Sequence, residues 1–78
     1  MSTLATLADT DRDLELRVRV FLASLGWQSL KQLHVRVNEV AVFLDGRVPS
    51  FYERQLAISA CQRVAGVYQV SESIEVAL

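Results

Sequence analysis

The apolar residues change their spacing three times along the chain, and this limits the fold more than any other feature of the sequence. Between residues 14 and 25 they lie on one side of a helix, at Leu14, Val18, Phe21, Leu22 and Leu25. In LHVRVN, residues 33–38, apolar and polar residues alternate, as in a strand with one buried face. A helical spacing returns after residue 50, and an alternating one after residue 66. The sequence therefore predicts an α+β protein and not an all-helical or all-strand one.

The first helix is predicted to begin at Thr10, whose hydroxyl can cap it, and to end at Gly26. Acidic residues crowd its start and arginines follow, which is the order that the helix dipole favours. Residues 1–8 show neither period. We expect them to form a flexible N-terminal arm, with a single domain over residues 9–78.

Two adjacent alternating segments predict a β-hairpin. The second is VAVFLDG, residues 40–46, in which Val42 and Leu44 share one face while Phe43 lies on the other. The turn is expected at Asn38-Glu39, although two-residue hairpin turns favour glycine after asparagine and Glu39 would have to accept a positive φ.

A second helix is predicted from about residue 51 to Gly66. Ser50 and Glu53 have the spacing of a capping box, and Pro49 keeps the preceding chain extended. Residues 67–76 then alternate again and predict a third strand.

The predicted order is α-β-β-α-β, in a two-layer sandwich with two helices on one face of a three-stranded mixed sheet. A right-handed crossover through the second helix makes the second and third strands parallel and gives the strand order 1-2-3. The helices are expected on the face that holds the buried strand positions. The opposite face is expected to be open and to carry His34, Arg36, Phe43, Gln69 and Ser73.

Size, charge and composition exclude several classes of function. The 78 residues are 51% apolar and 22% charged, which is typical of one globular domain with one modest core. A net charge of −1 argues against a nucleic-acid partner, because such partners require clustered Lys and Arg. No GXXG loop of the KH type joins the helices, although part of the element order is shared with that RNA-binding fold. The sequence therefore predicts no nucleic-acid binding.

The start of the chain lacks the basic and apolar regions of a signal peptide, which favours the cytoplasm for the chain as given but leaves the location unknown. No cofactor fingerprint or metal-ligand spacing is present, and we expect neither a cofactor nor a metal. Cys61 and His34 are expected on different faces, Cys61 as a small buried residue and His34 on the strand surface. Without a nucleophile beside a base, we expect no enzymatic activity.

The segments DRDLELRVRVFLASL, VRVNEVAVFLDGRVPS and ERQLAISACQRVAGVYQVSESIEV together resemble the BON domain, a module of bacterial osmotic-shock and nodulation proteins. Gly46 is similar to the family's glycine after its second strand, and Gly66 to the glycine of its helix-to-strand corner. Where such sequences usually open the second strand with glycine, this chain has Val40. The resemblance implies a non-catalytic module associated with phospholipid or envelope components, and a periplasmic or envelope location.

The candidate binding residues are those expected to be exposed near the open face and the turns: Phe43, Arg36, His34, Trp27 and Gly46. Gly46, Gly66, Ser50 and Glu53 are the expected turn and cap residues. Leu16, Val20 and Ala23 form a second apolar stripe, which we expect to widen the core. Two functions follow: binding of a phospholipid surface or an envelope protein, and, as the alternative, homo-oligomerisation or another protein-protein interaction.

Overall fold

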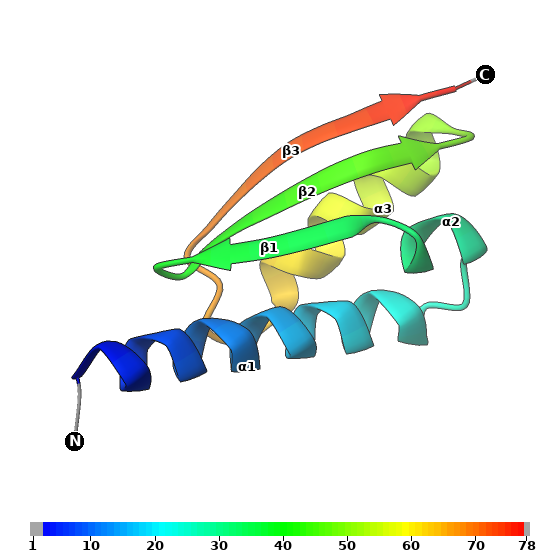
Figure 1. Cartoon of the computed structure of the whole chain (residues 1–78). Coiled ribbons are helices and arrows are strands. Elements are labelled where there is room, and N and C mark those ends of the chain that lie inside the picture. Colours follow the sequence, from blue (N-terminus) through cyan, green and yellow to red (C-terminus); the bar gives the residue numbers. More distant parts are fainter. Residues whose placement is uncertain (1–2, 78) are drawn as a thin grey trace.

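In the described part of the chain, the helices lie on one face of a three-stranded sheet (Figure 1). The computed structural model describes the backbone of residues 3–77 and the side chains of residues 11–77. Its elements are α1 (Thr3–Ser24), α2 (Gln28–Lys31), β1 (His34–Asn38), β2 (Ala41–Val48), α3 (Phe51–Arg63) and β3 (Gln69–Val76). The predicted α+β architecture is confirmed, with the short helix α2 as an addition.

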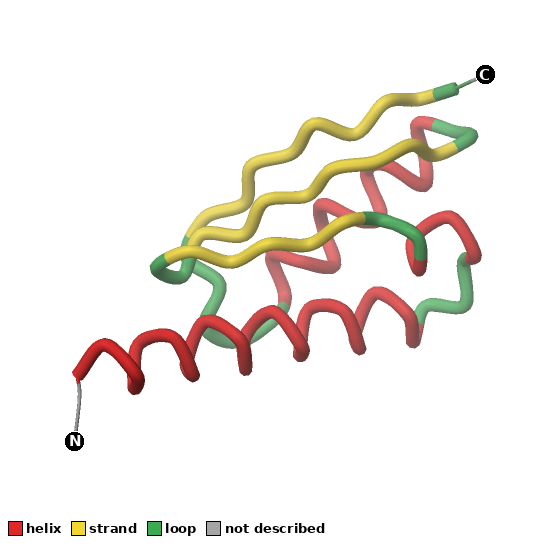
Figure 2. The backbone as a smooth tube through the Cα atoms, viewed as in Figure 1, coloured by secondary structure: helices red, strands yellow, loops and turns green. Residues whose placement is uncertain are grey.

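The strand order is β1-β2-β3, with β2 in the centre. β1 pairs with β2 in antiparallel orientation, whereas β2 and β3 are parallel and joined through α3. This is the predicted β-α-β crossover, in which the helix returns the chain across one face of the sheet. Figure 2 shows the resulting layers, with the strands on one side and the helices on the other.

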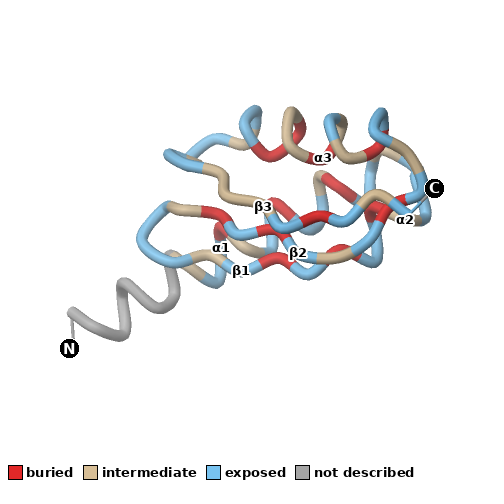
Figure 3. Tube along the Cα trace, turned by 90° about the horizontal axis from the view of Figure 1, so that it is seen from above, coloured by how far each residue is buried: buried red, intermediate tan, exposed pale blue. Residues whose placement is uncertain are grey.

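The core lies between these two layers, and buried residues of the strands and helices face each other there (Figure 3). Val35, Val42 and Leu44 point inward from the sheet, as the alternation predicts. The small residues Ala57 and Cys61 face them from α3 and are fully buried. Small side chains on that helix allow it to lie close to the sheet.

The predicted start of the first helix is wrong, because α1 begins at Thr3 and Thr10 lies inside it. The segment TLATLAD contains no glycine or proline and is rich in Leu and Ala, which favour the helix, so the helix continues through it. The division into an arm over residues 1–8 and a domain over residues 9–78 stays a prediction.

The hairpin turn lies one residue later than expected. Asn38 pairs with Ala41, so the turn residues are Glu39 and Val40. Both have a positive φ, 50° and 62°. Val40 thus stands in a left-handed turn position that glycine or asparagine would fill more easily.

Gly46 is not in a turn after the second strand but inside β2, opposite Ile74 of β3. Its φ is +149°, and a Cβ atom there would lie 2.8 Å from Cδ2 of Leu33. The glycine therefore leaves room for the buried Leu33 side chain and lets β2 continue to Val48.

A short helix that the sequence pattern does not predict, α2, connects α1 to β1. Gly26, with φ +83°, follows the end of α1 as expected. The chain then turns at Trp27, and Leu30 of α2 is buried in the core. α2 thus closes one end of the space between the sheet and the two long helices.

Candidate functional site

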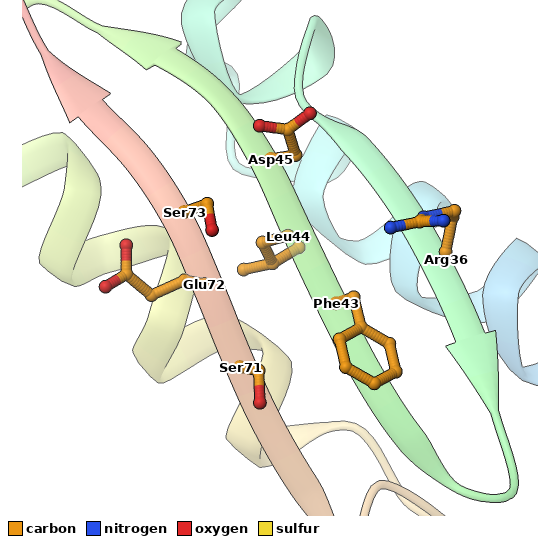
Figure 4. Close-up of a pocket in the computed structure, with 7 residues that line it drawn as sticks. All are labelled: Arg36, Phe43, Leu44, Asp45, Ser71, Glu72 and Ser73. Carbon is orange, nitrogen blue, oxygen red and sulfur yellow. The ribbon is translucent and has the colours of Figure 1, made fainter.

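The open face of the sheet carries the predicted binding residues of β1 and β2 side by side. The strand register places Arg36 opposite Phe43, and Phe43 in turn beside Ser71 of β3. His34 lies opposite Asp45 in the adjacent row. Figure 4 shows Arg36, Phe43 and Asp45 on the strands of this face. The predictions that Phe43 points away from the helices and that His34 lies on the strand surface are confirmed.

Phe43 stands between two shallow hollows of this face. One, of about 310 Å³, is lined by Arg36, Phe43, Leu44, Asp45, Ser71, Glu72 and Ser73. The other, of about 460 Å³, is lined by Arg36, Val37, Asn38 and Phe43. Phe43 is 38% exposed and is the large apolar residue of this surface.

Charges on the open face are balanced. Arg36 and Asp45 have opposite sign, and Arg47 forms an ion pair with Glu75 whose Nη2 to Oε1 distance is 2.8 Å. This face therefore offers an aromatic ring within mixed polar groups, not a surface of one sign. Such a surface suits a protein partner better than an anionic membrane.

Two of the predicted binding residues lie elsewhere. Trp27 is at the N-terminal end of α2, in the helix layer, where its ring packs against Tyr52 of α3 with a centroid distance of 5.7 Å. Gly46 is directed toward Leu33 on the helix-covered side of the sheet. The structure thus groups Phe43, Arg36 and His34 and separates Trp27 and Gly46 from them.

The predicted cap and corner residues occupy the positions expected of them. Ser50 is the N-cap of α3 and its hydroxyl oxygen accepts a hydrogen bond from the backbone N–H of Glu53. Glu53 in turn accepts hydrogen bonds from the hydroxyls of Ser50 and of Ser29 in α2. Gly66 has φ +98° in the turn between α3 and β3. These residues shape the scaffold.

A second surface lies between α1 and α3, on the side of the helices. This groove, which we call the α1–α3 groove, has a volume of about 440 Å³ and is lined by Leu16, Arg17, Val20, Phe21, Ser24, Arg63 and Val64. Leu16 and Val20 are 60% and 59% exposed, and Ala23 is exposed as well. The expectation that this stripe widens the core is therefore wrong, because α1 turns only its Leu14, Val18 and Leu22 side toward the sheet.

Both charged residues that line the α1–α3 groove are arginines. Arg17 donates a hydrogen bond from Nη1 to the backbone carbonyl of Ala65 at 3.2 Å, which places its guanidinium beside the end of α3. Its Nη2 lies 3.5 Å from Asp13, whose side chain is itself exposed. Arg63 adds a second positive charge from the last turn of α3. The groove therefore combines exposed apolar side chains with positive charge.

The sequence pattern indicates the apolar stripe but not this groove. The signal was the spacing of Leu16, Val20 and Ala23, but the pairing with Arg63 depends on how α1 and α3 pack. That packing brings together residues more than forty positions apart, and no local pattern encodes it.

Neither Cys61 nor His34 belongs to a reactive arrangement. Cys61 is buried in the core, and burial raises the pKa of its thiol to about 11, so that it stays protonated at neutral pH. His34 is exposed at the start of β1, on the sheet. Among residues 11–77, no cluster of three or more His, Cys, Asp or Glu side chains could hold a metal ion. No helix in the described part of the chain is long and apolar enough to cross a membrane.

This architecture, with helices on one face, an open sheet face and small surface hollows, defines a two-layer α+β domain. The BON domain family model matches residues 10–77, and the chain belongs to this family. It is thus a non-catalytic binding module by family, as BON domains generally are. No curated protein matches the sequence.

Proposed function

We propose that this BON domain binds a phospholipid surface that contains anionic lipid, and that the α1–α3 groove is its contact surface. The observation that carries the proposal is the groove's lining, in which exposed Leu16 and Val20 stand beside Arg17 and Arg63. Apolar side chains enter the boundary between headgroups and acyl chains, while arginines stay at the level of the phosphates.

The expected affinity is modest, since few positive charges take part. Each Arg near an anionic membrane surface contributes about 1 kcal/mol, and that contribution falls with added salt. The acidic residues, among them Asp13 beside Arg17, give the chain a net charge of −1, so the interaction depends on orienting the groove toward the membrane. Binding should therefore be strong only with anionic vesicles at low ionic strength.

Vesicle co-sedimentation tests the proposal with two matched pairs of variants. Arg63→Gln and Val20→Ser change the α1–α3 groove, while Arg36→Gln and Phe43→Ser make equivalent changes on the open sheet face. All four residues are exposed, so circular dichroism should show folded protein in each case. We expect Arg63→Gln to weaken binding to anionic vesicles about fivefold. Arg36→Gln and Phe43→Ser should bind like the unchanged protein.

Three results would contradict this assignment. Absence of binding to anionic vesicles at low salt removes the lipid function. Equal binding to zwitterionic vesicles removes the role of the arginines. Loss of binding in the sheet-face variants with retention in the groove variants moves the contact to the open face.

The second candidate function is binding of an envelope protein through the open sheet face. The observation that favours it is Phe43, whose half-exposed ring lies between two hollows and beside Arg36. Aromatic and Arg side chains are the residues that most often anchor protein interfaces. Under this function, Phe43→Ser abolishes capture of the partner and Val20→Ser leaves it unchanged.

A further inference from the structure

β3 has an unpaired edge along its whole length. It pairs with β2 on one side, and within residues 3–77 no strand lies on its other side (Figure 1). The strand is eight residues long, QVSESIEV, and contains no proline, lysine or glycine. Long edges without such residues are templates for pairing with a further strand.

The direction of the free backbone groups follows from the register. The N–H of Ala77 donates to the carbonyl of Val48 in β2 at 2.8 Å. Backbone groups of successive residues in a parallel pair point alternately toward and away from the neighbouring strand. The N–H and C=O groups that point to the unpaired edge of the sheet are therefore those of Val70, Glu72, Ile74 and Val76.

One of these edge donors is already occupied by a side chain. The N–H of Ile74 donates to Oε1 of Glu72 at 2.9 Å. Arg54 of α3 holds the same carboxylate, with Nη2 2.6 Å from Oε2 and Nε 3.2 Å from Oε1. Figure 4 shows Glu72 pointing off β3 on the side away from β2.

We propose that the β3 edge is a pairing surface for β3 of a second copy of this chain, and that the Arg54–Glu72 pair blocks it in the unmodified protein. This goes beyond the binding functions above, because it concerns neither the α1–α3 groove nor the open sheet face. With the block removed, two copies join their sheets edge to edge about a two-fold axis.

The side-chain pattern of β3 favours a register of this pairing that is centred on Ser73. In an antiparallel arrangement centred on Ser73, Val70 lies opposite Val76 of the second copy on the helix-covered face of the sheet. On the open face, Ser71 lies opposite Glu75 of the second copy. An arrangement centred on Glu72 would oppose two carboxylates. In the register centred on Ser73, the N–H of Ile74 bonds the Glu72 backbone carbonyl of the second copy. The Glu72 side chain holds that same N–H in the single chain, so it competes directly with dimer formation.

The first test is sedimentation equilibrium of the whole chain and of two carboxylate variants. We expect the unmodified protein to be monomeric and Glu72→Ala to dimerise with an association constant on the order of tenfold higher or more, because a hydrogen bond to a charged acceptor has that weight. Glu75→Ala is the matched control. It removes a carboxylate of the same strand that pairs with Arg47 and leaves the edge donor unaffected, so it should stay monomeric.

The second test locates the axis by disulfide formation. Ser73→Cys combined with Glu72→Ala should give a covalent dimer on mild oxidation. The two copies of residue 73 face each other as a non-hydrogen-bonded pair, whose Cα atoms lie roughly 4.5 Å apart. Ser71→Cys combined with Glu72→Ala should not, since the two Ser71 positions would be about 13 Å apart along the strand. Buried Cys61 is present in every variant, and the Glu72→Ala protein alone controls for its reactivity.

If Glu72→Ala does not fold, Glu72→Leu replaces it, because leucine retains much of the side-chain volume and has no oxygen to accept the bond from the Ile74 N–H. The proposal is overturned if the folded variants stay monomeric, or if the unmodified protein dimerises as strongly as they do. Cross-linking at residue 71 in preference to residue 73 overturns the register. Loss of vesicle binding by the Val20 and Arg63 variants bears on none of these results.

Discussion

Val40 is the residue most at odds with its backbone. Its φ of 62° lies in the left-handed region, which costs an ordinary L-residue about 1–2 kcal/mol. Val is β-branched and so fits this region worse than most residues. The hairpin nevertheless forms, because Val35, Val42 and Leu44 on the flanking strands fix the register by their burial.

Replacing Val40 with glycine should therefore stabilise the protein. We expect Val40→Gly to raise the free energy of unfolding by about 1 kcal/mol, since relief of strain exceeds the greater flexibility of glycine in the unfolded chain. Urea denaturation measures the change. Val40→Ala is the matched control. It removes the two γ-methyl groups but keeps Cβ, and should recover much less of the unfolding free energy. Equal stability of the two variants would show that the strain is not in the backbone.

At the residue scale the sequence predicts faces well and turns poorly. Alternation places Phe43 outward and Leu44 inward because the side-chain period of a strand is two. The sequence places the turn one residue too early because Asn38 is a better turn former than Val40. Burial of the alternate strand residues fixes the register and overrides that preference. Asp-Gly at 45–46 is likewise a turn signal. Gly46 is instead needed for the approach of Leu33, a contact outside its local segment.

Among the elements, α2 and α3 are joined through one buried carboxylate. Glu53 is only 7% exposed and accepts hydrogen bonds from Ser50 at the start of α3 and from Ser29 in α2. The first contact is the capping box that the sequence predicts, and the second is not visible in the sequence. Glu53 therefore both begins α3 and holds α2 against it.

Ser29→Ala tests this link. We expect a loss of about 1 kcal/mol in the free energy of unfolding, because the mutation removes a hydrogen bond to a buried carboxylate. Ser24→Ala is the control, since its hydroxyl bonds the Phe21 carbonyl of its own helix at an exposed position. Thermal unfolding of both variants gives the comparison. An equal loss in the two would mean that the Ser29 contact adds nothing beyond that of an ordinary exposed serine.

The presence of the two long helices follows from the sequence, whereas the start of α1 and the short helix α2 do not. α3 carries a cap signal and a stripe of small residues over three turns, which identify its start and its buried face. α2 is four residues long, too short for any period to appear. The exposed apolar stripe of α1, formed by Leu16, Val20 and Ala23, shows a related limit of prediction from the sequence. Leu14 and Leu16 are equally apolar, and only the packed sheet determines which of them is covered.

At the scale of the molecule, one rule predicts most of the topology. A right-handed crossover requires α3 to lie on a definite face of β2 and β3, and α1 covers the rest of the same face. The candidate binding surfaces follow less directly. The open face results from the strand alternation, whereas the α1–α3 groove and the Arg54–Glu72 pair exist only once separate elements have packed.

The Arg54–Glu72 pair also makes the stability of the whole molecule depend on pH. The hydrogen bond from Arg54 and, next, that from the N–H of Ile74 hold the pKa of Glu72 below its ordinary value. At neutral pH this carboxylate is ionised in both the folded and the unfolded chain, and its contribution to stability is complete. Below about pH 4.3, the ordinary value for glutamate, the unfolded chain takes up this proton first, so the contribution declines as pH falls through the lowered pKa.

Glu72→Gln should therefore remove part of the loss of stability on acidification. We expect the difference in unfolding free energy between the unmodified protein and this variant to be largest at neutral pH and to shrink between roughly pH 5 and pH 3, as followed by urea denaturation. Glu75→Gln supplies the control, because the Arg47–Glu75 pair is exposed on both sides and such pairs contribute little. A difference for Glu72→Gln that is constant across this range would mean that the carboxylate acts through its shape and not its charge. In that case its hold on the Ile74 N–H, and with it the block on the β3 edge, would persist in acid.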